Sequence, residues 1–359
     1  CMKICLFGLF AAKFYRNDLL RKGLEQSGAT LYTCTTQRTG PLRYLDLWRT
    51  YKTIPEHDVV YVPWPGYRSI FLARLLSRKP IVYDLVYGEH EMQVISRQKS
   101  WNVSLYSWLL RTLDRLGVQR ATLASVETAS QREYISASSH IPKERLRVIY
   151  SGCHEERFPF SPPRSAEEIK QTRLRVLLRG QAMTESGLRV VAEAMNRLKD
   201  KPYFFHIVSG GDQTIFDREF RQTLTVQDPA YCKVEFGRFE QSYLQQVYID
   251  TDVTIGHLAN HERTLRTIPY KAFESMSTGR PYITAASKAV SELLQDDVSC
   301  VFIEPGSVDS LVAKLEELRL HPEKLLRIGQ AAHEQAKRIS IEANGRAFLA
   351  LCQEAIDLC

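Results

Sequence analysis

The stretch Arg266–Ala285, which reads RTIPYKAFESMSTGRPYITA, decides the fold prediction for this chain. Pro269 suits the start of a helix, the pattern from Tyr270 to Ser277 is helical, and Gly279 stands where a helix C-terminus favours a left-handed residue. A new apolar run begins at Pro281 and is typical of a strand. The stretch therefore predicts a loop, a helix, a tight turn and a strand in succession.

The predicted helix makes the preceding loop a candidate anion site. A helix that begins at Pro269 directs its first backbone N–H groups and its positive dipole end into the segment His257–Thr267. Glu274 lies inside the helix, with Lys271 three residues earlier on the same face. Taken alone, Lys271 and Glu274 also fit a solvated surface ion pair of little energetic value.

Strands and helices alternate over the rest of the chain as well. The predicted strands are Lys3–Leu9, Thr30–Cys34, Val59–Val62, Pro80–Leu85, Leu123–Val126 and Leu146–Ile149 in the first half, and Arg175–Leu178, Tyr203–Val208, Val234–Phe236, Val253–Ile255, Pro281–Thr284 and Cys300–Ile303 in the second. Such alternation predicts an α/β fold of doubly wound parallel sheets. Because ligands gather at the carboxyl ends of parallel strands, Gly8, Pro65, Gly66 and the loop after Asp84 are expected to face one crevice.

Four segments carry a family resemblance. IPYKAFESMSTGRPYITA resembles the donor-binding segment of family 4 glycosyltransferases, which have the GT-B fold. FGLFAAKFYRNDLLRKGL, RVIYSGCHEERFPF and EPGSVDSLVAKLEEL are similar to other segments of a bacterial branch of that family that builds polysaccharides or glycolipids. The resemblance implies two Rossmann-like domains that face each other across a cleft.

The resemblance also implies a domain organisation. An acceptor-binding domain is expected over residues 1–160 and a nucleotide-sugar-binding domain over residues 173–340. The polar, proline-rich segment 161–172 is expected to be the linker between them. A final helix in residues 341–359 is expected to cross back onto the first domain.

The family pattern assigns a donor site to the second domain. In the family the helix glutamate, here Glu274, holds the ribose hydroxyls, and a carboxylate suits vicinal hydroxyls because it accepts charge-assisted hydrogen bonds. Arg266 and Lys271 are the expected catalytic residues, and Arg238 is expected to flank the base. The full donor-binding prediction is Gly180, Gln181, Gly187, Gly210, Arg238, His257, Arg266, Ile268, Lys271 and Glu274.

The sequence departs from the family where the donor diphosphate is normally neutralised. Gln181 and Ser186 replace the usual arginine and lysine, so Arg179, Lys271 or Arg266 would have to substitute for them. Arg266 also stands where many members have a glutamate that contacts the sugar.

Acceptor-binding residues are expected in the first domain. The predicted set is Gly8, Arg16, Pro65, Gly66, Glu89 and His90. Arg16 fits a phosphate or acceptor ligand and equally a surface arginine that caps a helix. The segment GEHE, residues 88–91, fits an acceptor-binding loop or a solvated loop, and its single histidine matches no metal-binding pattern.

Composition and charge limit the location and the partners. The eight cysteines show no paired spacing and no run is long enough to cross a membrane, so a cytoplasmic protein is expected. Residues 1–160 carry a net charge of +9 against −2 for the remainder. The segments Tyr67–Lys79 and Trp101–Arg115 combine basic and aromatic residues, so each fits either contact with the inner face of an anionic membrane or an ordinary core-facing helix. No nucleic-acid-binding motif accompanies the basic half.

The sequence therefore predicts a glycosyltransferase that moves a sugar from a nucleotide diphosphate, UDP or GDP, to a hydroxyl of a glycan or lipid-linked acceptor. The resemblance implies a retaining reaction, and neither a metal nor another cofactor is expected. A nucleotide-sugar 2-epimerase and a non-catalytic partner subunit of another transferase remain open as alternatives, because fold alone does not fix function.

Overall fold

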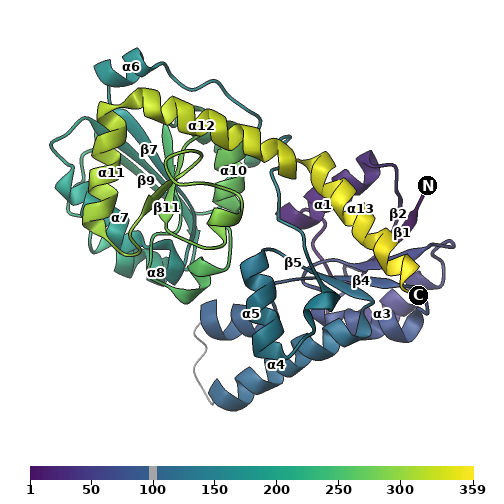
Figure 1. The fold of residues 1–359 in the computed structure, drawn as a ribbon. Helices are drawn as coiled ribbons and strands as arrows, with labels where there is room; N and C mark the ends of the chain where they lie inside the picture. Colours follow the sequence, from purple (N-terminus) through teal and green to yellow (C-terminus); the bar gives the residue numbers. More distant parts are fainter. Residues whose placement is uncertain (97–102) are drawn as a thin grey trace. The chain divides into compact units, whose positions relative to one another are not determined.

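The computed structural model describes residues 1–96 and 103–359, which form two compact units. The first unit comprises Cys1–Gly152 together with Ile339–Cys359, and the second comprises Cys153–Arg338. Each unit contains a parallel six-stranded sheet with helices packed against it (Figure 1). The predicted α/β class with two doubly wound parallel sheets is confirmed.

The sheet of the first unit has the strand order β2-β1-β3-β4-β5-β6. Its strands are β1 (Lys3–Phe7), β2 (Thr30–Cys34), β3 (Val59–Val62), β4 (Ile81–Val86), β5 (Leu123–Val126) and β6 (Leu146–Val148). Its helices are α1 (Tyr15–Gln26), α2 (Leu42–Tyr51), α3 (Ile70–Leu76), α4 (Val103–Arg120), α5 (Ala129–Ser139) and α13 (Ile341–Asp357). One apolar cluster fills the space between the sheet and α2 to α5, where the alternate strand residues point.

The other face of this sheet is covered by α1 and by α13, the last helix of the chain. The two helices approach closely because both carry glycine at the contact: a Cβ added at Gly23 would lie 2.3 Å from the backbone oxygen of Ile341, and one added at Gly345 would lie 2.1 Å from Gly23. Tyr61 of β3 and Phe348 of α13 pack with ring centroids 4.5 Å apart. These contacts anchor the final helix in the first unit.

The sheet of the second unit has the strand order β12-β11-β10-β7-β8-β9. Its strands are β7 (Leu174–Ala182), β8 (Tyr203–Gly211), β9 (Cys232–Phe236), β10 (Val253–Ile255), β11 (Tyr282–Ala285) and β12 (Val301–Ile303). Its helices are α6 (Ala166–Gln171), α7 (Leu188–Arg197), α8 (Gln213–Phe216), α9 (Gln241–Ile249), α10 (Tyr270–Thr278), α11 (Val308–Leu320) and α12 (Pro322–Ala336). Its largest apolar cluster joins one face of the sheet to α7, α11 and α12.

Helix α10 forms as its sequence predicts. Pro269 occupies the N-cap position, and Gly279 closes the helix with φ of 74°, in the left-handed region that glycine adopts without a steric penalty. All of its residues from Lys271 to Thr278 are buried. The interpretation of Lys271 and Glu274 as a solvated surface pair is therefore wrong, since the helix that carries them lies inside the second unit.

The segment 161–172 differs from the linker that its composition suggests. It lies within the second unit and contains helix α6, whose N-terminus has a capping box between Ser165 and Glu168. Ile169 is buried, and Arg164 forms an ion pair with the buried Asp252. A polar segment is ordered here because its side chains satisfy backbone groups and a buried carboxylate.

The two segments with a membrane-binding pattern both fall largely on helices. Tyr67–Lys79 contains α3, and Trp101–Arg115 overlaps α4, although Trp101 itself lies outside the described residues. On α4, Leu105 is 62% exposed and Trp108 is 61% exposed. Within the described ranges, no helix is both long enough and apolar enough to span a bilayer.

Candidate functional site

The strand order of the second unit marks where its ligand site is expected. The chain runs from β7 outward to β8 and β9, and then returns to place β10 on the other side of β7. The strand order therefore reverses between β7 and β10, and in open α/β sheets ligands bind at the carboxyl ends of the strands at such a point. Helix α10 follows the loop after β10, so its N-terminus belongs to the same region.

A buried carboxylate lies at the centre of this region. Both oxygens of Glu274 accept hydrogen bonds from Nη1 of Arg179, which is near the carboxyl end of β7. Oη of Tyr248, on α9, donates to Oε2 of the same carboxylate at 2.7 Å. The Glu274 side chain is 2% exposed, whereas that of Arg179 is 24% exposed. The Arg179 guanidinium therefore covers the carboxylate on its more open side.

Lys271 lies one turn before Glu274 and is also buried. Its Nζ donates to the backbone oxygen of Gly256 at 3.3 Å, and a Cβ at Gly180 would lie 3.4 Å from the same Nζ. Burial and, secondarily, the positive charge of Arg179 lower the pKa of Lys271 to about 7. The fraction of Lys271 that is protonated near pH 7 therefore depends on the charges that surround its Nζ.

A second buried ion pair braces the loop after β7. Nη1 of Arg263 donates to Oε1 of Glu185 at 2.7 Å, and Glu185 itself is fully buried. Burial raises the pKa of Glu185, but the charge of Arg263 outweighs this effect and holds that pKa below its usual value. Oγ of Ser186 donates to the backbone oxygen of Gln181 at 3.0 Å. The position that carries a lysine in the family is here an internal hydrogen-bond donor.

The turn after this loop lies against the segment that follows β10. Gly187 has φ of 69°, and a Cβ there would lie 2.8 Å from the backbone nitrogen of Ala259. The amides of Leu258 and Ala259 donate to the backbone oxygens of Ser186 and Glu185 at 3.3 Å and 3.4 Å. Glycine at 187 therefore lets the loops after β7 and β10 join by backbone hydrogen bonds.

Three other predicted donor residues lie in the segment before α10. His257 follows β10, and burial, Lys271 and Arg263 lower its pKa well below the usual value, so its imidazole is neutral. Nη1 of Arg266 lies 3.5 Å from Oε2 of Glu262, and the Arg266 side chain is 12% exposed. Ile268 is buried at 2% exposure. Arg263 and Arg266 lie in the segment before α10 and Lys271 lies in its first turn, and each of the two arginines has a carboxylate partner.

The remaining two predicted donor residues lie farther along the sheet edge. Gly210 is the second-last residue of strand β8, where a Cβ would lie 2.6 Å from the backbone oxygen of Gly237. Arg238 follows β9 and is exposed. The structure therefore brings Gly180, Lys271 and Glu274 into one cluster, and places Gly210 and Arg238 at the neighbouring strand ends.

The predicted acceptor residues lie in the first unit, at one edge of its sheet. Gly8 follows β1, Pro65 and Gly66 follow β3, and Glu89 follows β4. Because β1, β3 and β4 are adjacent, these residues lie at neighbouring carboxyl ends, and their role in acceptor binding stays a prediction.

The loop that contains Glu89 and His90 is held by a buried aspartate. Glu89 is 8% exposed and His90 is 5% exposed, so the interpretation of this loop as solvated is wrong. Their backbone amides donate to the carboxylate of Asp114 on α4, at 2.9 Å and 3.3 Å. Burial raises the pKa of Asp114 to about 7, in spite of these two hydrogen bonds.

Arg16 is buried, so its interpretation as a surface arginine is wrong. It is fully buried between α1 and the sheet, where Nε and Nη2 donate to the two oxygens of Asp84 at 2.8 Å each. Nη1 donates to the backbone oxygen of Ile149, also at 2.8 Å. These bonds use the guanidinium on three sides, so Arg16 stabilises the first unit and is not a surface cap, and its role in acceptor binding stays a prediction.

Several residues of the cluster carry no sequence signal strong enough to find them. Tyr248 looks like an ordinary apolar position of α9, and Glu185 and Arg263 are 78 positions apart. Arg179 lies outside the predicted donor-binding set, but the sequence indicated it, with Lys271 and Arg266, as a cation able to replace the missing pair. In the described part of the chain, no group of three or more His, Cys, Asp or Glu side chains is arranged to hold a metal ion.

Comparison with known proteins agrees with this geometry. Residues 173–320, which contain the whole cluster, match the family model described as "Glycosyl transferases group 1". This part of the chain is therefore similar to that glycosyltransferase family. The match covers β7 to α11, so it coincides with the sheet of the second unit.

Two curated relatives are also glycosyltransferases. An uncharacterized glycosyltransferase of Methanocaldococcus jannaschii is 19% identical over 56% of this chain and 52% of its own length. The amylovoran biosynthesis glycosyltransferase AmsK of Erwinia amylovora is 23% identical over 57% of this chain and 49% of its own length. The aligned region thus spans about half the length of either relative.

Solved glycosyltransferase structures share the fold over the full chain. Sucrose-phosphate synthase of Thermosynechococcus elongatus superimposes with a TM-score of 0.74 at 13% identity, with 100% of both chains covered. HepE of Anabaena, in a complex with UDP-glucose, superimposes with a TM-score of 0.71 at 15% identity, covering 99% of this chain and 100% of its own. The two units therefore have the GT-B fold, as the sequence resemblance implied.

Proposed function

We propose that this protein transfers a sugar from a nucleotide-diphosphate donor, UDP or GDP, to a hydroxyl of a glycan or lipid-linked acceptor. The observation that carries the proposal is the cluster at the start of α10. There, Glu274 is buried among Arg179, Lys271 and Tyr248, at the point where the strand order reverses between β7 and β10. A helix N-terminus bordered by cations suits a diphosphate, and a carboxylate suits the hydroxyls of a ribose.

The cations around α10 replace the pair that the sequence lacks. Lys271 and Arg266 act on the diphosphate or on the transferred sugar, and Arg179 supplies a further charge. Preorganised cations of this kind stabilise the negative charge that develops on a leaving diphosphate, where water is excluded. The protein accordingly needs no metal ion, and the configuration at the sugar carbon is retained, as the family resemblance implies.

Ribose binding by Glu274 needs a rearrangement of its partners. Its carboxylate has four lone-pair sites in all, and Arg179 and Tyr248 occupy most of them. A donor that hydrogen-bonds to Glu274 therefore displaces Arg179, which is the more exposed partner. The released guanidinium is then available to the diphosphate a short distance away.

The acceptor is assigned to the first unit, at the loops that contain Gly8, Pro65, Gly66, Glu89 and His90. The basic charge of this unit and the exposed Trp108 on α4 favour an acceptor held at an anionic membrane surface. The protein would then act on the cytoplasmic side of that membrane.

Binding and product analysis test the proposal. Purified protein is titrated calorimetrically with UDP, GDP, ADP and their glucose conjugates, in the presence and absence of EDTA. We expect saturable binding of one nucleotide class that EDTA leaves unchanged and that Glu274→Gln weakens. Sugar transfer to an added lipid or glycan acceptor distinguishes a transferase from a 2-epimerase, which would release only the epimeric nucleotide sugar.

One observation favours a second candidate, a non-catalytic partner subunit. Gln181 and Ser186 leave the loop after β7 without the two cations of the family pattern, and Ser186 is committed to an internal hydrogen bond. If none of the nucleotides binds at millimolar concentration, the function as a non-catalytic partner subunit is better supported than sugar transfer.

A further inference from the structure

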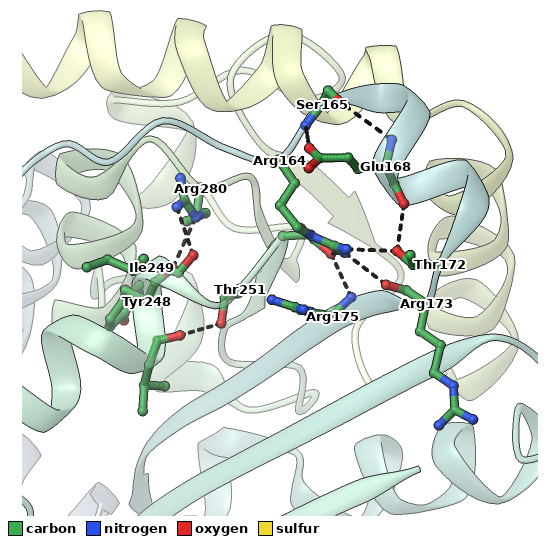
Figure 2. A network of polar contacts seen from close by, with 12 residues as sticks. Arg164, Ser165, Glu168, Thr172, Arg173, Arg175, Tyr248, Ile249, Thr251 and Arg280 are labelled. Carbon is green, nitrogen blue, oxygen red and sulfur yellow. Dashed lines mark hydrogen bonds and ion pairs between the residues drawn. The ribbon is translucent and has the colours of Figure 1, made fainter. Parts of the chain in front are cut away.

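A cavity of the second unit lies at the opposite end of β7 from the Glu274 cluster. Its volume is about 520 Å³, which is the size of a pocket for a small organic molecule. It lies where β7 and β8 begin and where α9 ends, and Arg175 in its wall precedes the Arg179 of the cluster by four residues. Figure 2 shows this region, with Arg164 before α6, Arg173 between α6 and β7, and Arg175 in β7.

One of the three arginines is fixed by internal bonds. The Arg164 guanidinium pairs with both oxygens of Asp252 and donates to Oγ1 of Thr172 at 2.8 Å and to the backbone oxygen of Arg173 at 2.9 Å. Asp252 also accepts from the backbone amide of Arg175 at 2.8 Å. Arg164 and Asp252 neutralise each other and hold the start of β7 in place.

The other two arginines are not neutralised. Among the residues that the structure describes, neither Arg173 nor Arg175 has a carboxylate within ion-pair distance, and the Arg175 guanidinium has no hydrogen-bond partner. The Arg173 guanidinium donates only to the backbone oxygen of Ala230. Figure 2 shows the Arg175 side chain extending toward Thr251 at the end of α9. Two guanidinium groups that form no ion pair of their own favour an anionic ligand, and a guanidinium suits phosphate because it donates in pairs.

The other walls indicate what the rest of the ligand resembles. Phe204 is paired with Arg175 across the β7–β8 ladder, so both side chains point to the same face of the sheet. Its partly exposed ring offers a flat apolar surface, and His206 lies two residues further along the same face. Asp250 also lines the cavity, and its carboxylate is able to accept hydrogen bonds from hydroxyl groups.

From these contacts we infer that the cavity between Arg175, Phe204 and Asp250 binds a sugar monophosphate. Its phosphate lies against Arg173 and Arg175, its ring packs on Phe204, and its hydroxyls donate to Asp250. The site is separate from the cluster around Glu274, because it lies at the amino ends of the strands and not at their carboxyl ends. It is also independent of the proposed transferase activity, since its test requires binding alone.

Calorimetric titration of the full chain with glucose 6-phosphate tests the inference, with glucose and inorganic phosphate as comparison probes. We expect saturable binding of glucose 6-phosphate, weaker binding of inorganic phosphate and none of glucose. Arg175→Ala removes charge-assisted hydrogen bonds and is expected to weaken binding about tenfold or more. Arg175→Lys keeps the charge without the paired donors, so an intermediate affinity is expected even if the alanine variant is poorly folded.

Two control variants distinguish binding in this cavity from nonspecific charge effects and from binding at the donor site. Arg189→Ala removes an exposed arginine of α7 that pairs with Glu219, and Lys271→Met alters the candidate donor site. Both are expected to bind glucose 6-phosphate as the wild type does. The inference is overturned if the wild type does not bind, if Arg189→Ala loses as much affinity as Arg175→Ala, or if only Lys271→Met loses binding. Equal affinity for inorganic phosphate and glucose 6-phosphate would overturn the assignment of a sugar.

Discussion

Arg179 and Glu274 are 95 positions apart in the sequence and form an ion pair inside the second unit, with the Glu274 side chain 2% exposed. The pair joins the carboxyl end of β7 to the middle of α10. It therefore connects the two elements that border the candidate donor site, and a change in either residue should affect both the packing and the ligand binding of that region.

Replacing Glu274 is expected to lower stability as well as donor binding. Glu274→Ala leaves the positive charge of Arg179 without its partner and the buried Tyr248 hydroxyl without its acceptor. Loss of one member of a buried pair costs about 3 kcal/mol in the free energy of unfolding. Urea denaturation measures this change. Glu262→Ala removes an exposed partner of Arg266, and should cost less than about 1 kcal/mol.

Donor binding is expected to take up protons near pH 7.5. The pKa of Lys271 is lowered to about 7, so much of the population is neutral there, and a diphosphate placed beside it raises that pKa again. Calorimetric titrations of nucleotide in buffers of different ionisation enthalpy measure the uptake. Lys271→Met should abolish it, and an unchanged uptake in that variant would assign the proton to another group.

The stability of the ligand-free protein should also depend on Lys271. Between pH 7 and its unfolded value near 10.5, the lysine binds a proton in the unfolded chain but not in the folded one. The contribution of this group to the free energy of unfolding therefore rises with pH over that window. Below pH 7 the buried lysine is charged in the folded protein, and its destabilising effect is greatest. Comparing the pH profiles of the wild type and Lys271→Met isolates this contribution.

Asp114 should have the opposite effect in the first unit. Burial raises its pKa from 3.8 to about 7, so the folded protein holds a proton that the unfolded chain has lost between these values. Its contribution to stability is therefore greatest at low pH and decreases as the pH rises through 7. Asp114→Asn should flatten the profile in this range, whereas an equally steep profile would point to other carboxylates.

Restoring the family cations should affect the two positions differently. Gln181 is exposed, so Gln181→Arg adds a charge near the diphosphate and is expected to tighten nucleotide binding about tenfold. Ser186 is 1% exposed, and Ser186→Lys forces a long side chain into a filled space, with an expected loss of roughly 1–3 kcal/mol in stability. Calorimetry and denaturation measure the two effects. Gln181→Met serves as the uncharged control for the first.

Membrane contact is expected to depend on α4. Trp108→Ala should reduce sedimentation of the protein with vesicles that contain anionic phosphatidylglycerol, because Trp108 is 61% exposed on a helix with basic residues nearby. Trp48→Ala, on α2, removes a tryptophan that is covered by Lys52 and serves as the matched control. Equal binding of all three proteins would exclude α4 as the contact surface.

The sequence by itself determined the fold class and the position of α10. Alternating apolar runs set the strands and helices, and Pro269 and Gly279 set the ends of that helix, because these are local properties of the chain. The candidate cations Arg179, Lys271 and Arg266 were also identifiable from type and spacing. These features depend on residues that are near one another in sequence.

Only the tertiary structure decided which of these residues share an environment. Arg16 looked exposed by its polarity, but the return of α13 and the position of Asp84 bury it completely. Tyr248 gave no signal, because its contact with Glu274 depends on how α9 packs beside α10. Burial and long-range pairing arise from the packing of segments far apart in the chain, and it is burial that sets the pKa of Lys271 and the charge available at the candidate site.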